Sequence, residues 1–173
     1  MNPPTPAAAL VLHVNGRECE TRAGPGVPLL YVLRNDIGLS ATRFGCGTEQ
    51  CGACVVLVDG RPVYACTLPV SAAVGHRITT LEGLAANGHA HALQQALLAE
   101  QAAQCGYCIS GMMMRAQALL QKNPKPTDAQ IRAELEPHLC RCGTHMRILR
   151  AVHRAARLMD TAALSSTTHG STP

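Results

Sequence analysis

Aromatic side chains are nearly missing from this sequence, at 2% of its 173 residues, and tryptophan is absent. A core without aromatic bulk has to be filled with leucine, valine, alanine and methionine, and small domains of that kind need covalent or metal staples. The net charge is only +4, and no run of basic residues occurs. Nucleic-acid-binding domains carry basic patches, often with stacking aromatics, so we expect no nucleic-acid partner.

Long hydrophobic runs are absent too, and none approaches the length of a membrane span. The N-terminal segment 1–9 is rich in proline and alanine and has no basic start and no apolar stretch, unlike a signal peptide. We therefore expect no direct membrane insertion and a cytoplasmic location. A periplasmic or membrane-associated location, reached inside a complex exported on a partner's signal, stays the alternative. Structural disulfides are rare in the cytoplasm, where cysteine clusters more often bind metal.

Cysteine is abundant, with nine residues. Eight of them fall into two sets of four, spaced C-x4-C-x2-C-x11-C and C-x2-C-x31-C-x-C. The first set is Cys46, Cys51, Cys54 and Cys66, and the second is Cys105, Cys108, Cys140 and Cys142. Cys19 is left over and is expected to be a buried, inert thiol. Two sets of four predict two four-thiolate metal sites, one in each of two domains.

The first set has the spacing of plant-type [2Fe–2S] ferredoxins. Three of its thiolates come from one short loop, residues 44–54, which has to wrap tightly around an anionic cluster. Gly45, Gly47 and Gly52 permit such wrapping, because glycine adopts positive φ and lets the backbone approach closely. Main-chain N–H groups of a wrapped loop can then point at the sulfur atoms, as they do in anion-binding nests.

The second set has a different design, because each of its cysteine pairs stands just before a predicted helix. Two helix N-termini would place partial positive charge beside one negatively charged cluster. The C-x2-C pair is also a zinc pattern, so zinc stays an alternative for this set. Disulfides are disfavoured because no secretory signal is present.

The first half of the chain has strand patterns and the second half has helical patterns, which predicts the fold class α+β. Asn15-Gly16 and Asp59-Gly60 are hairpin-turn dipeptides. The expected strands are 10–14, 18–22, 55–58 and 63–64. The expected helices are 29–35 after Pro28, then 93–100, 110–122, 127–135 and 144–159. The expected N-caps are Ser110, Thr127 and Thr144, and Thr127 forms a capping box with Gln130.

A composition change after Leu84 indicates two domains. We expect one [2Fe–2S] domain over 9–84, a second over 89–161, and a polar, disordered tail over 162–173.

Three further features have expected positions. The run Met112 to Met114 is expected in the helical core, because methionine fills irregular gaps. Arg147, Arg150, Arg154 and Arg157 form a stripe along the last helix, which is either a solvated face or a partner-docking face. The eight histidines have no ligand spacing and are expected at the surface; His145 follows the second cysteine set closely enough to tune a cluster there.

The motifs FGCGTEQCGAC (44–54), QCGYC (104–108) and LCRCGT (139–144) resemble the iron–sulfur subunit of molybdenum hydroxylases, the xanthine and aldehyde oxidoreductase family. They look most like the small subunits of nicotinate dehydrogenase and isoquinoline 1-oxidoreductase. The resemblance implies a β-grasp, plant-type ferredoxin-like domain followed by a four-helix bundle with its own [2Fe–2S] cluster.

The resemblance also implies an electron route. Electrons would leave a molybdopterin centre on a large partner subunit, pass through the cluster of the second set and then that of the first, and reach a cytochrome c (haem c) or an FAD subunit. Gln104 matches the family residue that contacts the molybdopterin, and Cys142 matches the ligand nearest the pterin. The substrate would be an N-heterocycle such as nicotinate, or an aldehyde, and no residue of this chain would touch it. A free-standing ferredoxin-like carrier and a zinc-stabilised adaptor are the alternatives.

Overall fold

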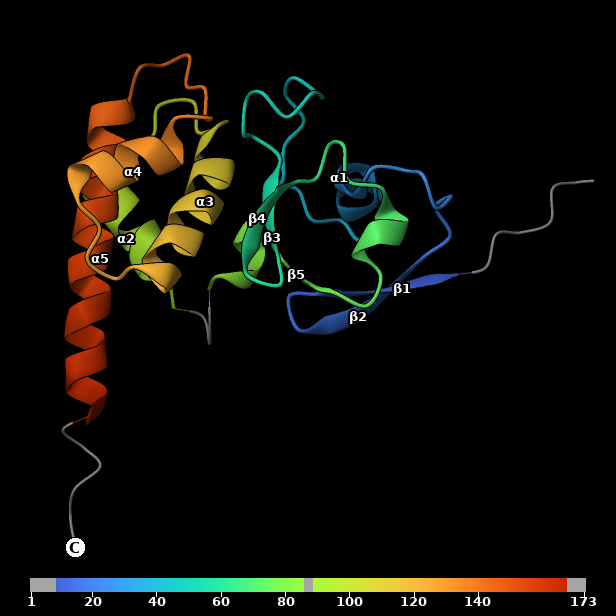
Figure 1. The fold of residues 1–173 in the computed structure, drawn as a ribbon, viewed down its shortest axis with the longest axis horizontal. Coiled ribbons are helices and arrows are strands. Elements are labelled where there is room, and N and C mark those ends of the chain that lie inside the picture. Colours follow the sequence, from blue (N-terminus) through green and yellow to red (C-terminus); the bar gives the residue numbers. More distant parts are fainter. Residues whose placement is uncertain (1–8, 86–88, 168–173) are drawn as a thin grey trace, which may run out of the picture.

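The computed structural model describes residues 9–85 and 89–167, with side chains up to residue 161. A sheet half and a helical half lie side by side (Figure 1). In chain order the elements are β1 (Leu10–Val14), β2 (Arg17–Thr21), α1 (Leu29–Tyr31), the π-helical η1 (Val32–Asp36), β3 (Val55–Val58), β4 (Arg61–Tyr64), the 3-10 helix η2 (Val70–Ala73), β5 (Arg77–Thr79), the 3-10 helix η3 (Leu81–Gly83), α2 (Ala92–Ala99), α3 (Ile109–Lys122), α4 (Asp128–Leu135) and α5 (His145–Thr167). The predicted α+β class is confirmed.

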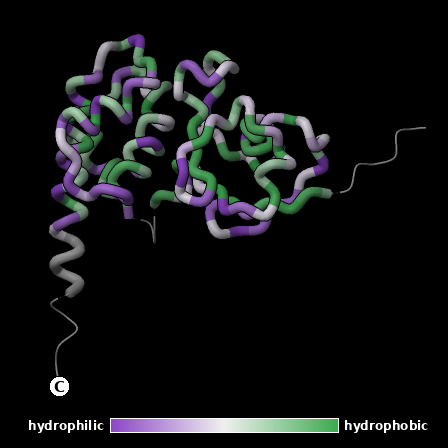
Figure 2. Tube along the Cα trace, viewed as in Figure 1, coloured by the Kyte–Doolittle hydropathy of each residue, from purple (hydrophilic) through white to green (hydrophobic). Residues whose placement is uncertain are grey.

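The sheet has five strands in the order β2-β1-β5-β3-β4, with β1 and β5 parallel and the other neighbours antiparallel. Both predicted hairpin turns form, and Asn15, Gly16, Asp59 and Gly60 all have positive φ, as a two-residue hairpin turn of type I′ requires. The helical segment α1–η1 begins after Pro28, as predicted, and buries leucine and valine against the sheet. This topology is the expected β-grasp arrangement. In Figure 2 hydrophobic segments run through the interior of the sheet half, with hydrophilic ones around them.

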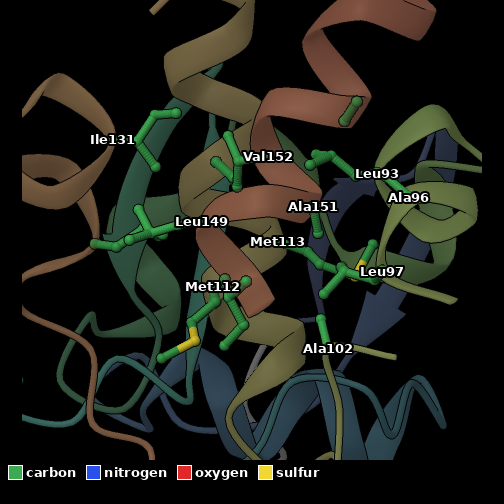
Figure 3. Packing of buried hydrophobic residues seen from close by; sticks show 14 of the residues in the cluster. Leu93, Ala96, Leu97, Ala102, Met112, Met113, Ile131, Leu149, Ala151 and Val152 are labelled. Atoms are coloured by element: carbon green, nitrogen blue, oxygen red, sulfur yellow. The ribbon is translucent and has the colours of Figure 1, made fainter. Parts of the chain in front are cut away.

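The helical half is a bundle of α2 to α5 whose side chains converge on one core (Figure 3). Met112 and Met113 of α3 lie in this core with Ile131 of α4 and Val152 of α5, so the core position predicted for these methionines is correct. Met114 faces the other way and packs on Val55 and Leu57 of β3. A methionine run thus serves both the bundle core and the junction with the sheet.

The helix ends differ from expectation at two places. The capping box of Thr127 and Gln130 forms at α4 as predicted. However, the N-cap of α3 is Cys108, so Ser110 is not a cap; it lies inside the first turn, with its side chain buried. Helix α5 continues beyond the predicted start of a disordered tail at 162 and ends at Thr167, and the rest of that segment lies outside the described residues. The limits predicted for the two domains stay predictions.

No helix in the described part of the chain is both long and apolar enough to span a bilayer. The sheet and the bundle meet where α3 packs on β3. A Cβ on Gly111 of α3 would lie 1.9 Å from the carbonyl oxygen of Gly52, which shows how closely the helix approaches the cysteine-bearing loop.

Candidate metal centres

The loop of residues 44–54 is wrapped as its glycines predict. A Cβ on Gly45 would lie 2.5 Å from Sγ of Cys51, so only glycine fits there without moving the thiol. Gly47 and Gly52 have φ of +71° and +75°, which favours glycine. The wrapping brings main-chain N–H groups onto sulfur: the Sγ of Cys46 accepts from the N–H groups of Thr48 and Gln50, and the Sγ of Cys51 accepts from the N–H of Cys46.

The four thiols of the first set gather at this loop. Cys46 and Cys51 are neighbours, as are Cys54 and Cys66, and within each pair the neighbouring thiol shifts a pKa. Cys54 and Cys66 are buried, Cys51 is half-buried and Cys46 is exposed. Cys54 and Cys66 therefore close the site on the side of β3, and Cys46 remains at the surface.

The surroundings shift the pKa values of Cys54 and Cys46 in opposite directions. Burial raises the pKa of Cys54 to about 12. At Cys46 burial acts in the same direction, but the hydrogen bonds from Thr48, Gln50 and Cys51 outweigh it and lower the pKa to about 6. A thiolate is the form that binds metal, and the lowered pKa of Cys46 favours that form at neutral pH.

The second set also gathers, at the N-termini of α3 and α5. Cys105 and Cys142 are neighbours, as are Cys108 and Cys140, and within each pair the neighbouring thiol shifts a pKa. Cys108 is buried and its burial raises the pKa to about 12, whereas Cys105 is exposed and the N–H of Tyr107 lowers its pKa. At Cys140 burial raises the pKa, but hydrogen bonds from the Thr144 side chain and backbone bring it to about 7.

A dinuclear cluster and a single metal ion require different arrangements of four thiols. Within the described residues, no group of three or more Cys, His, Asp or Glu side chains converges as a mononuclear site requires. Structural zinc needs four donors on one ion, whereas a [2Fe–2S] cluster distributes its four thiolates over two irons. The neighbouring thiol pairs within each set suit the second pattern.

Two contacts join the loops that carry the sets. The hydroxyl of Tyr107 donates to the carbonyl oxygen of Phe44 at 2.5 Å, and the N–H of Leu139 donates to the carbonyl oxygen of Cys51 at 3.1 Å. In Figure 1 the loop before β3 and the segment between α4 and α5 both lie at the upper side of the molecule. The two candidate centres are therefore neighbours across the junction of the two halves.

Sequence reasoning missed one residue at this junction. His138 is 2% exposed, which contradicts the expectation that the histidines lie at the surface. Burial, together with the positive charge of Arg115, lowers its pKa to about 4, so the imidazole is neutral at pH 7. The signal available in the sequence was only its position two residues before Cys140. His145, by contrast, is exposed as expected.

The remaining candidates lie at the surface or are otherwise engaged. Gln104 is exposed next to Cys105. Cys19 is half-buried in β2 rather than fully buried. Of the arginine stripe, Arg150 and Arg154 form ion pairs with Glu100 at the end of α2, so this part of the stripe holds α5 to α2.

Two family models match this chain, one in each half. Residues 12–76 match the family model described as 2Fe-2S iron-sulfur cluster binding domain, and residues 80–153 match the [2Fe-2S] binding domain. The chain is thus an iron–sulfur protein with two [2Fe–2S]-binding domains in tandem.

Its relatives identify the family. The chain is 54% identical over 145 residues to one of the subunits of nicotinate dehydrogenase from Pseudomonas putida, covering 84% of this chain and 92% of that one. It is 49% identical to the alpha subunit of isoquinoline 1-oxidoreductase from Brevundimonas diminuta, covering 83% and 95%. The chain belongs to the iron–sulfur subunits of molybdenum hydroxylases, as predicted, and so forms part of an oxidoreductase.

Solved structures give the same result. Quinoline 2-oxidoreductase from Pseudomonas putida 86 superposes with a TM-score of 0.79 at 33% identity, over 89% of this chain and 98% of the matched chain. The aldehyde oxidoreductase from Desulfovibrio desulfuricans superposes with a TM-score of 0.84 at 37% identity, over 88% of this chain and 17% of that one. The predicted order of a ferredoxin-like domain and a helical [2Fe–2S] domain is consistent with both.

Proposed function

We propose that the two thiol sets are the ligands of the two [2Fe–2S] clusters. The observation that carries this proposal is the gathering of eight cysteines into two groups, each separate in sequence and each made of neighbouring thiols that shift one another's pKa. When bound, each cluster supplies one-electron redox chemistry. The chain contributes four thiolates to each site, and main-chain N–H groups that stabilise negative charge on sulfur.

The proposed role is an electron relay from the molybdopterin centre of a large partner protein to an acceptor. Electrons enter at the second set, beside Gln104, which contacts the molybdopterin, and near Cys142, the ligand closest to the pterin. They leave from the first set. The exposure pattern supports a relay, because Cys105 and Cys46 each bring one sulfur of a set to the surface, where a partner can approach.

The final acceptor in this proposal is a cytochrome c or an FAD subunit. The substrate class is an N-heterocycle similar to nicotinate, or an aldehyde, which follows the names of the relatives: nicotinate dehydrogenase, isoquinoline 1-oxidoreductase and aldehyde oxidoreductase. The substrate reacts on the large subunit, and this chain contributes no group to that chemistry. We place the complex in the cytoplasm.

The alternative, a free-standing ferredoxin-like carrier, is not favoured, because the relatives are named as subunits of larger oxidoreductases. Affinity purification of the full chain from its native host distinguishes the subunit role from the free-standing carrier. A stable complex with a large molybdopterin-containing polypeptide supports the subunit role, and a chain that purifies alone with both clusters supports the carrier.

The ligand assignment is tested by Cys51→Ser and Cys108→Ser in the full chain. We expect about four irons per wild-type chain and two distinguishable [2Fe–2S] signals by electron paramagnetic resonance. Each variant should lose one signal and keep the other. Cys19→Ser is the matched control and should keep both, since Cys19 is not a member of either set. Loss of both signals in either single variant, with the protein folded, would contradict two independent sites.

A further inference from the structure

His138 lies between the two candidate centres. It follows helix α4, and its N–H donates to the carbonyl oxygen of Leu135 at 3.0 Å. The next residue, Leu139, donates its N–H to the carbonyl oxygen of Cys51 at 3.1 Å, and Cys140 comes directly after. One hydrogen bond therefore joins a cysteine of the first set to the residue beside a cysteine of the second.

The imidazole packs closely on the residue after Cys51. A Cβ on Gly52 would lie 2.1 Å from Nδ1 of His138 and 2.6 Å from its Cγ and Cε1, so the ring lies against the Gly52 main chain. Gly111 of α3 approaches the carbonyl oxygen of the same glycine. The helical half thus contacts Gly52 at two separate places. These contacts fix the main chain at Gly52 and, with it, the neighbouring Cys51 carbonyl.

The need to fill space at position 138 does not by itself explain why the residue is a histidine. Both ring nitrogens are buried, and neither has a hydrogen-bond partner among the described residues. Burying polar atoms unpaired costs free energy that a leucine or methionine would not incur. An imidazole is, however, the smallest flat ring among the side chains, and a flat ring is what lies closely against a peptide.

We propose that His138 is a positioning residue for electron transfer between the two clusters: by holding the Gly52 main chain, it maintains the hydrogen bond between Leu139 and Cys51 that connects the two sites. The step moves one electron from the second-set site, which is oxidised, to the first-set site, which is reduced, and no bond is made or broken. Electronic coupling is stronger through bonds and hydrogen bonds than across a gap, so loss of this contact weakens it. This inference rests on the proposed function.

The test compares His138→Ala, His138→Asn and wild type as full chains purified with any accompanying subunit. His153→Ala is the matched control, because it removes a half-buried histidine of the same bundle that pairs with Asp128 and lies outside the contact with Gly52. Three quantities are measured: the iron content, the magnetic interaction between the two reduced clusters, and the rate of electron passage between them after rapid reduction. A purely structural role would not change the last two while the individual cluster signals stay intact.

In His138→Ala we expect both clusters to be present, a smaller magnetic interaction and electron passage about tenfold slower, since positioning errors on the order of 1 Å have effects of this size or larger. His138→Asn keeps a flat polar group and should retain most of the wild-type rate, and His153→Ala should equal wild type.

Should His138→Ala fail to load iron, the Asn variant decides: a rate close to that of wild type supports the inference. Wild-type coupling in an iron-loaded His138→Ala chain, or strong loss in the Asn variant with both signals intact, overturns it. Absence of two clusters in the wild-type chain would instead refute the proposed function.

Discussion

Gly111 of α3 and Gly52 of the cysteine-bearing loop are in direct contact, with only 1.9 Å between the place of a Cβ on Gly111 and the carbonyl oxygen of Gly52. Glycine is unfavourable inside a helix, so its presence in α3 has to be explained by this approach. The contact lets the helical half reach the loop that carries three cysteines of the first set. A pair of glycines thus determines how closely the two cluster-binding halves pack.

Gly111→Ala is therefore predicted to destabilise the protein although alanine is the better helix former. The helix gains up to about 1 kcal/mol, but the clash with a main-chain oxygen costs about 1–3 kcal/mol. Denaturant unfolding of the iron-loaded protein should give a lower free energy of unfolding. Gly26→Ala is the control, because a Cβ there meets nothing within 4 Å. A more stable Gly111→Ala protein would show that the halves do not pack this closely.

Met113→Ala is predicted to lower the free energy of unfolding by about 2–5 kcal/mol, because it leaves a cavity in the bundle core. Met146→Ala, at a side chain that is 56% exposed, should change it by less than about 0.5 kcal/mol. Equal effects from the two substitutions, measured by denaturant unfolding, would contradict the core described for the bundle.

Glu100→Gln is predicted to destabilise the protein in a pH-dependent way. Hydrogen bonding to Arg154, at 3.0 Å, and the contact with Arg150 lower the pKa of Glu100 below its ordinary value of 4.5. A carboxyl whose pKa is lower in the folded state stabilises the fold above the unfolded pKa and loses that contribution as the pH falls through the folded pKa.

Thermal unfolding should therefore show a lower midpoint for Glu100→Gln than for wild type at pH 7, and the difference should shrink below pH 4.5. Glu136→Gln, at an exposed position of the same half, is the control and should follow wild type. A difference between Glu100→Gln and wild type that stays constant down to low pH would show that the ion pairs are not its source.

Thr127→Ala should cost about 1 kcal/mol of stability, since the hydroxyl of Thr127 accepts a hydrogen bond from the N–H of Gln130 at the start of α4. Thr127→Ser keeps the hydroxyl and should remain close to wild type. The comparison is made by denaturant unfolding, and equal losses in both variants would argue against a capping role.

The sequence predicted what depends on local spacing. Three cysteines of the first set lie within one loop, so their convergence follows from a few residues and their glycines. The hairpin turns and the capping box of α4 are also local, and the structure has them where they were expected.

Features that depend on distant contacts were missed. The strand β5 is only three residues long, and it forms because β1 and β3 flank it on both sides. His138 is buried because the first half of the chain packs over it, which no periodicity in the second half reveals. Ser110 was expected to cap α3, but Cys108 occupies that position two residues earlier.

The parallel pairing of β1 with β5 also fixes an order of events during synthesis. His13 pairs with Arg77 and Val14 with Ile78, so the sheet closes only after the ribosome has passed all four cysteines of the first set. Contacts so far apart in sequence form slowly, because a long loop has to be closed first. The nascent chain therefore exposes those thiols before the strand at residues 77–79, which completes the sheet around them, has emerged.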